Sequence, residues 1–445
     1  MEGATSDTDA RLEPSGPAAP GPDGSDAPRE ARIRIFSPLK LRDFSLLWWG
    51  MSISLLGDGV YIVAITWLVF RITGTNPTAL SAVFVAWTVP QVLFLLVAGV
   101  ATDRFDRRAV LVASDVVRGI SIAAVGVLVL TDALELWHLY ILVAVYGAGE
   151  AFFMPAFGAI MPDVVPKHWL VQANSLAELA RPFTLRLVGP ALGGFLIQGF
   201  GVGTAFLFDA GTFVISLIAV LAMRRVPRVR DPSSLISARR EIGEGLRFIR
   251  SRTWLWAGLG ATGVALLVYF GPWTVLVPAV IRTELGGGAA DFGLVLAFGG
   301  AGAIIASLFV GQGGLPRAPI VVVFASWAFT TLTLVGFGTA TALWQMFLLS
   351  FFFYALFTLG QIIWFTLVQT HVPTALLGRV TSADWLVSSA LIPVSVGLAG
   401  PLGKSFGTTT TLVAAGALAW AVLLGCLLIP GIRDVEEAEP QPASK

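Results

Sequence analysis

Several ionisable side chains lie inside long apolar segments of this sequence, where charged groups are unusual. Asp58 and Glu150 each fall near the middle of such a segment, and neither has a basic residue three or four positions away. A charge in hydrocarbon costs at least ~2.5 kcal/mol, so it needs a partner, an aqueous cavity or a function. These carboxyls therefore either pair with another helix, with Arg181 and Arg186 as candidates, or stay protonated in the apolar interior. A carboxyl of the second kind can bind and release protons near physiological pH.

Other charges in the apolar segments occur at helical spacing. Asp115 with Arg118, and Glu178 with Arg181, stand three positions apart, so each pair can neutralise itself on one helix face. For these four residues a structural ion pair and a transport role both remain open. Our candidates for proton coupling are Asp58, Glu150, Glu178, Arg181 and Arg186.

The composition indicates that lipid surrounds most of the chain. Of its 445 residues, 56% are hydrophobic and only 13% are charged, and a water-soluble domain cannot bury that much apolar surface. The net charge of +1 argues against binding to nucleic acid, which requires a large basic excess. No nucleophile, metal-ligand cluster or phosphate loop stands out, so we expect neither an enzyme nor a metal or cofactor.

Apolar runs of about 20 residues, the length that a helix needs to cross a ~30 Å bilayer core, recur along the chain. They predict an all-α membrane protein with twelve transmembrane helices. The predicted spans are 46–70, 79–101, 109–131, 137–161, 170–199, 203–223, 254–281, 290–312, 318–340, 343–369, 379–402 and 408–430.

The long segment 224–253 divides the predicted spans into two groups of six. We therefore expect an N-terminal six-helix bundle over 37–223 and a C-terminal bundle over 254–430. Residues 1–36 are rich in Pro, Gly, Ala and Asp, which predicts a disordered tail, and residues 431–445 form a second tail.

Basic residues predict the orientation, because Lys and Arg resist translocation across the membrane. Most of the 29 Lys and Arg residues lie in the tails and in loops on the same side as the termini, whereas the opposite loops hold only Arg71, Arg282 and Lys404. Both termini are therefore expected on the cytoplasmic face of the inner membrane.

The linker has an amphipathic pattern in its second part. Ile242, Leu246 and Ile249 recur at helical spacing among basic residues, which predicts a helix on the cytoplasmic leaflet. A solvated linker with some helix is the alternative. The two bundles also show a weak repeat, in which Gly149-Glu150 of the fourth span corresponds to Gly360-Gln361 of the tenth. Like halves frame a central site in many transporters, so the repeat predicts pseudo-symmetric bundles.

The second bundle offers aromatic and amide side chains instead of charges. An apolar pocket with a few polar groups suits amphipathic ligands, and aromatic faces attract cations. For any one of these aromatics, packing against other helices or lipid is the alternative. Our candidates for the substrate cavity are Tyr269, Trp273, Gln361 and Trp364.

The loop between the second and third spans carries an acid followed by several bases. Its residues Gly99, Asp103, Arg104, Arg107 and Arg108 resemble the signature loop G-x-x-x-D-R-x-G-R-R of the major facilitator superfamily, except that an acid stands where the superfamily more often has its second glycine. Such a loop can lock helix ends together through charge-assisted hydrogen bonds, which predicts a gating role. For the two final arginines, a purely topological role is the alternative.

The fifth span contains Gly189-Pro190-Ala191-Leu192-Gly193-Gly194. Proline bends a helix and glycines let a neighbour approach, so Gly189, Pro190, Gly193 and Gly194 predict a hinge or a tight seal. The stretch resembles the core of the motif of drug:proton antiporters. A plain packing face of small residues is the alternative.

Over residues 38–430 the chain is most similar to the superfamily branch that contains macrolide-efflux proteins and the enterobactin exporter. This resemblance implies alternating access, with proton influx driving export of a small amphipathic or hydrophobic molecule such as a drug, antibiotic, siderophore or secondary metabolite. Its implied partners are membrane lipid, the substrate and protons, and it is expected to be a monomer. A proton-coupled importer, or a membrane receptor or assembly factor that transports nothing, remains the alternative.

Overall fold

The computed structural model describes residues 34–224, 238–313 and 315–437. The regular elements in these ranges are all helical, and twelve helical segments are long and apolar enough to cross a membrane. The predicted class and number of spans are therefore confirmed. The prediction of a disordered tail over residues 1–36 differs from the structure at the end of the tail, because Arg34–Lys40 forms a 3-10 helix. The rest of that tail lies outside the described residues.

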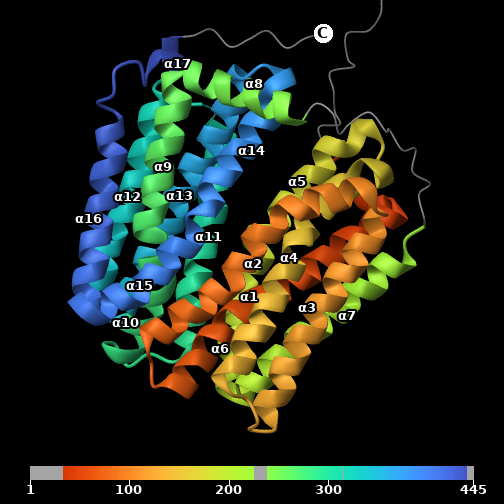
Figure 1. Cartoon of the computed structure of the whole chain (residues 1–445), viewed down its shortest axis with the longest axis vertical. Coiled ribbons are helices and arrows are strands. Elements are labelled where there is room, and N and C mark those ends of the chain that lie inside the picture. The colour runs from red at the N-terminus through yellow and green to blue at the C-terminus, as the bar shows by residue number, and fades with distance from the viewer. Residues whose placement is uncertain (1–33, 225–237, 314, 438–445) are drawn as a thin grey trace, which may run out of the picture.

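The first six spans form one helical bundle, at the lower right of Figure 1. The fifth of them is interrupted by a π-helical segment, η3, between two α-helices. The elements of this N-terminal bundle are α1 (Arg42–Thr73), α2 (Pro77–Arg104), α3 (Arg107–Leu130), α4 (Leu136–Val164), α5 (Leu170–Arg181), η3 (Pro182–Val188), α6 (Gly189–Phe200) and α7 (Val202–Ala222).

The last six spans form the second bundle (Figure 1). Two of them, the seventh and the eleventh spans of the chain, are also interrupted. Its elements are α9 (Thr253–Gly271), the π-helical η5 (Pro272–Leu276), α10 (Val277–Thr283), α11 (Ala289–Gly313), α12 (Pro319–Thr339), α13 (Leu343–His371), α14 (Thr374–Ala390), α15 (Ile392–Phe406) and α16 (Thr408–Cys426). A short helix, α17 (Asp434–Glu437), follows.

Proline accounts for the interruptions. Both π-helical segments begin at a proline, Pro182 or Pro272, and Pro393 follows the break between α14 and α15. Proline has no backbone N–H, and its ring crowds the carbonyl four residues earlier, so the regular hydrogen-bond ladder cannot continue. The fifth and eleventh spans, which correspond in the two bundles, are thus both broken.

The two bundles meet most closely at one end of the molecule. There the amide of Gly400 in α15 donates to Ser81 Oγ of α2 at 2.8 Å, and a Cβ on Gly194 of α6 would lie 2.7 Å from the carbonyl oxygen of Ala289 at the start of α11. Figure 1 shows the bundles converging at this end, beside α10, and diverging toward the end that carries α17 and the linker helix α8 (Ala238–Ser251). The structure is therefore closed at the α10 end.

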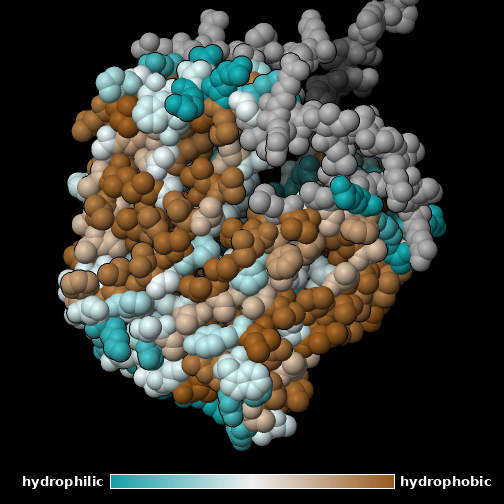
Figure 2. Space-filling model, viewed as in Figure 1, coloured by the Kyte–Doolittle hydropathy of each residue, from teal (hydrophilic) through white to brown (hydrophobic). Residues whose placement is uncertain are grey.

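On the face that Figure 2 shows, apolar side chains form a broad brown band across both bundles, and polar side chains concentrate toward the two ends. Large exposed side chains of the spans include Phe208, Ile215, Phe309 and Leu418. An apolar band of this kind is what a lipid-embedded surface requires.

The linker contains the helix α8 (Ala238–Ser251), while residues 225–237 lie outside the described part of the chain. Glu244 of α8 forms an ion pair of 2.6 Å with Arg379 at the start of α14. Ile249 is buried, whereas Leu246 is 51% exposed. The linker helix therefore lies against the second bundle with one apolar side chain still accessible.

Candidate functional site

A buried arginine occupies the centre of the N-terminal bundle. Arg118 of α3 is 1% exposed, and its guanidinium nitrogens lie 2.7 Å from Asp115 Oδ1 and 3.7 Å from Asp58 Oδ2. The rings of Phe153 and Phe213 each lie 4.5 Å from the guanidinium carbon. The predicted pair of Asp115 and Arg118 is present, and two carboxylates and two aromatic faces compensate one buried cation.

Neutral hydroxyl groups complete this cluster. Tyr146 of α4 donates to Asp58 Oδ1 at 2.7 Å, and Ser216 of α7 donates to Asp115 Oδ2 at 2.7 Å. Each carboxylate is therefore paired with the same cation and accepts one hydrogen bond from a neutral hydroxyl. Arg118, the two carboxylates and the two hydroxyl groups come from α1, α3, α4 and α7. The cluster therefore ties together four of the six spans of the bundle.

The prediction of the residue that pairs with Asp58 from another helix is wrong. The sequence suggested Arg181 or Arg186, but the ion pair is made by Arg118. A guanidinium presents five N–H donors in a planar fork, so Arg118 serves its neighbour on α3 and the carboxylate on α1 together.

The expected pair of Glu178 with Arg181 is also wrong. Within the ranges that the structure describes, no ion pair joins these two residues, and Glu178 is exposed. Arg181 instead donates to Met154 Sδ at 2.8 Å. A thioether is a weak acceptor, so Arg181 keeps most of its hydrogen-bonding capacity.

Arg186 belongs to the contact between the bundles. Its guanidinium carbon lies 5.1 Å from the ring of Tyr354 in α13. Its backbone lies against α11, because a Cβ on Gly300 would come within 2.7 Å of the Arg186 carbonyl carbon. Arg186 is thus placed to hold the bundles together by a cation–π contact.

Glu150 lies beside the arginine cluster in a different environment. Its Oε2 accepts a hydrogen bond of 2.7 Å from Trp87 Nε1. The ring of Tyr61 lies 5.1 Å from the ring of Trp87 and 4.6 Å from that of Tyr146. Among the described residues no cation is within ion-pairing distance of Glu150, so a single neutral donor supports this carboxyl.

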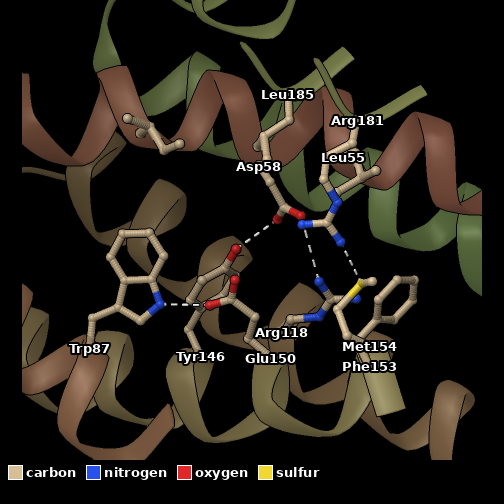
Figure 3. Close-up of a pocket in the computed structure, with 11 residues that line it drawn as sticks. Leu55, Asp58, Trp87, Arg118, Tyr146, Glu150, Phe153, Met154, Arg181 and Leu185 are labelled. Atoms are coloured by element: carbon tan, nitrogen blue, oxygen red, sulfur yellow. Dashed lines mark hydrogen bonds and ion pairs between the residues drawn. The ribbon is translucent and has the colours of Figure 1, made fainter. Parts of the chain in front are cut away.

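The two carboxyls open onto one cavity of about 120 Å³ (Figure 3). Drug-sized ligands occupy pockets of roughly 300–1,000 Å³, while a water molecule takes up about 30 Å³. The cavity therefore suits a few water molecules better than a drug-sized ligand. Its lining residues are Leu55, Asp58, Ile62, Trp87, Arg118, Tyr146, Glu150, Phe153, Met154, Arg181 and Leu185.

Comparison with known proteins identifies the family. A family described as transmembrane secretion effector matches residues 33–444. The chain belongs to this family of the major facilitator superfamily. Members of the superfamily are transporters rather than enzymes.

Similar transporters match the chain along most of its length. The MFS-type transporter YfiS of Bacillus subtilis is 27% identical over 401 residues, covering 87% of this chain and 92% of its own. The multidrug efflux pump Tap of Mycolicibacterium fortuitum is 28% identical and covers 86% and 94%. Macrolide efflux protein A of Streptococcus pyogenes is 23% identical and covers 88% and 97%.

Solved structures show the same fold at low sequence identity. A mutant of the peptide transporter POT superposes with a TM-score of 0.69 at 10% identity, covering 88% of this chain and 95% of that one. A mutant of the nucleoside transporter NupG gives 0.68 at 9% identity, covering 87% and 99%. These likenesses support the major facilitator fold.

The superfamily's signature loop is anchored within the N-terminal bundle. Arg107 forms an ion pair of 2.6 Å with Asp163 near the end of α4, and Arg108 Nε donates to the Val220 carbonyl near the end of α7 at 2.9 Å. Asp106, which departs from the superfamily pattern, accepts a hydrogen bond from the Arg108 amide and caps α3. The departure therefore has a structural role.

The other loop residues make fewer described contacts. The side chain of Asp103 lies outside the described part of the chain, and Arg104 is exposed at the end of α2. Among the described residues, a Cβ on Gly99 would meet nothing within 4 Å, so this glycine is not in close contact with another helix in this conformation. This end is also where the bundles diverge.

The glycines of the antiporter motif press against α1. A Cβ on Gly189 would lie 2.8 Å from Gly59 Cα, and one on Gly193 would lie 2.9 Å from Val60 Cα. Asp58 directly precedes this contact, so the motif fixes the backbone that presents the carboxylate.

The opposite face of the same motif contacts the second bundle. Besides Gly194 against Ala289, the carbonyl oxygen of Pro190 lies directly against Gly293 of α11. Larger side chains at these positions would separate α6 from α11. The motif therefore lies in a tight seam between the bundles, next to the coupling candidates.

The substrate-cavity candidates are mostly buried within the second bundle. Trp273 stacks on Phe353 at 4.3 Å, and Tyr269 is 6% exposed. Trp364 is 2% exposed, and Gln361 is half-buried. In this conformation three of the four belong to the packed core of the bundle.

Sequence reasoning missed several members of the cluster. Tyr146 stands four positions before Glu150, so helical spacing places both on one face and offered a signal. Trp87 and Ser216 reach the carboxylates from α2 and α7, and only the arrangement of the helices reveals them.

Proposed function

We propose that this protein exports a small amphipathic or hydrophobic molecule across the cytoplasmic membrane in exchange for protons, by alternating access. The observation that carries the proposal is the shared cavity of Asp58 and Glu150 in the N-terminal bundle. Two similar proteins that extend over most of the chain are a multidrug efflux pump and a macrolide efflux protein, which supports export.

In this scheme the two carboxyls perform different tasks. Asp58 is held by Arg118 and Tyr146, whereas Glu150 has one neutral donor, so Glu150 is the carboxyl that changes charge more easily. A proton on Glu150 removes a charge from the cavity. We propose that this change favours the conversion between the two open forms of the transporter.

In this scheme the substrate binds between the bundles, with the half-buried Gln361 of the second bundle as a contact. The aromatic candidates, which are packed in the core of that bundle in the conformation described, become contacts only when the bundle opens. The cavity of Asp58 and Glu150 has room for a few water molecules rather than a drug-sized ligand. This supports separate sites for the proton and the substrate. The excess of basic residues in the loops beside the termini supports cytoplasmic termini, so the conformation described is closed toward the outside.

Inverted membrane vesicles test the proposal. We would measure uptake of two probes, radiolabelled erythromycin and ethidium, while an imposed gradient acidifies the vesicle lumen. Export predicts accumulation that stops when a protonophore collapses the gradient. Loss of preloaded probe from the lumen on acidification would instead indicate an importer, and the absence of gradient-dependent movement of either probe would overturn the proposal.

A further inference from the structure

A third acid lies deeper in the N-terminal bundle, at the contact of α7 with α1. Asp209 of α7 is 0% exposed. Its carboxyl occupies the recess left by Gly57 on α1, where any larger side chain would collide with Asp209 Oδ1. The recess lies directly beside Asp58, the next residue of α1, so two carboxyls enter the bundle from adjoining positions.

The hydrogen bonds of Asp209 fall short of what a carboxylate requires. Thr212 Oγ1 lies 3.3 Å from Oδ1, but that hydroxyl is engaged more closely, at 2.7 Å, with the Asp209 carbonyl oxygen. Oδ2 has no hydrogen-bond partner among the residues that the structure describes. An ionised carboxylate in hydrocarbon with one weak neutral donor is costly, so in this conformation Asp209 holds a proton.

The charged groups facing Asp209 do not remove this cost. Asp58 on α1 repels a second negative charge, and Arg118 on α3 is already paired with Asp58 and Asp115. On α6, which also packs against α7, the sequence over Gly189–Phe200 contains no titratable side chain.

Two features give Asp209 a route for its proton. Tyr61 lies one turn beyond Gly57 on α1, and its ring is 6.1 Å from that of Phe206 on α7. Within the described part of the chain its buried hydroxyl has no hydrogen-bond partner. Arg118 lies against Phe213, one turn from Asp209 along α7. A modest shift of α1 against α7 would therefore bring the Asp209 carboxyl toward the Tyr61 hydroxyl, which can relay a proton. The Arg118 guanidinium is the cation on the same side.

We propose that Asp209 is a second proton-binding site, so that each transport cycle carries two protons. One proton binds at the cavity of Asp58 and Glu150 and the other at Asp209. In the proposed orientation both protons come from water outside and return to water in the cytoplasm. The inference rests on the proposed proton coupling.

Proteoliposomes with the membrane potential clamped to zero test this stoichiometry. The logarithm of the steady-state erythromycin or ethidium accumulation ratio, plotted against the pH difference, has a slope equal to the number of protons per substrate. We expect a slope of two for the wild type and one for Asp209→Asn. At a difference of one pH unit the variant then accumulates about tenfold less probe.

Thr212→Val is the matched control, because it alters the same interface but keeps the acid, and its slope should stay at two. Substrate counterflow without a gradient reports whether each variant is folded. If Asp209→Asn does not fold, the wild-type slope alone decides, since a slope of one excludes a second proton. A slope of two in a folded Asp209→Asn variant also overturns the inference, whereas no gradient-driven accumulation by the wild type would refute the proposed function itself.

Discussion

The buried ion cluster shows how one side chain organises a membrane bundle. Arg118 neutralises carboxylates from its own helix and from α1, and aromatic rings cover the faces of its guanidinium. Burying these charges is tolerable because each ion has an opposite charge within reach and each carboxylate also accepts a hydrogen bond from a hydroxyl. Glu150, just outside the cluster, lacks this support.

At the residue scale we expect Glu150→Gln to weaken gradient-driven accumulation, because only the proton bound at Asp209 is left to drive it, while counterflow stays intact. Glutamine keeps the size of the side chain and can still accept the hydrogen bond from Trp87, but it does not bind a proton. Uptake into inverted vesicles, with and without a gradient, measures the difference. Unchanged gradient-driven uptake would exclude Glu150 from coupling.

Removing the central cation should affect stability first. Arg118→Leu leaves Asp58 and Asp115 facing each other without their cation, and breaking a buried pair in this way costs about 3–5 kcal/mol. Thermal unfolding of the detergent-solubilised protein should show a large fall in Tm. Arg181→Leu, which removes a more accessible arginine without an ion-pair partner in the described ranges, is the control and should change Tm little.

Helices α2, α6, α11 and α15 form the closed end through close backbone contacts. Glycines at these contacts let the helices approach without side chains between them, which makes the seam sensitive to any added volume. The interrupted fifth and eleventh spans carry two of these surfaces, so local breaks in the helices accompany the closing contacts.

At the element scale we expect Gly400→Val to open the α10 end. A Cβ on Gly400 would meet Thr78 Cα at 2.6 Å, so valine must push α15 away from α2. Val85 of α2 lies against Gly397 of α15, one turn from Gly400. In a Cys426→Ser background, Val85→Cys should therefore react faster with a membrane-impermeant maleimide in intact cells. Gly425→Val is the control, because a Cβ there meets nothing within 4 Å. Equal reaction rates in the two variants would contradict the seal.

The whole molecule is two bundles joined at one end and apart at the other (Figure 1). The charges that we assign to coupling lie in the first bundle, while the second bundle is mainly apolar and aromatic. Bundles that resemble each other in fold therefore differ in chemistry, and any coupling between them passes through the seam beside the antiporter motif.

At the scale of the whole molecule, the excess of Lys and Arg in the loops beside the termini predicts the orientation in the membrane. In the Cys426→Ser background, Lys404→Cys should be labelled by an impermeant maleimide in intact cells, and Arg317→Cys only after permeabilisation. Lys404 lies exposed in the last turn of α15, and Arg317 lies between α11 and α12, at the opposite end of the spans. The reverse pattern would place the termini outside and reverse the proposed direction of transport.

The sequence by itself determined the twelve spans and the family, because span length and hydropathy are local properties and the signature motifs are contiguous. It also identified Asp58 and Glu150 from their apolar surroundings. Only the tertiary structure decided their partners. Helical periodicity tells which residues share a face, and it found Asp115 with Arg118, but it does not tell which helix that face meets. Thus Arg118 rather than Arg181 pairs with Asp58, Trp87 supports Glu150, and the recess at Gly57 receives Asp209.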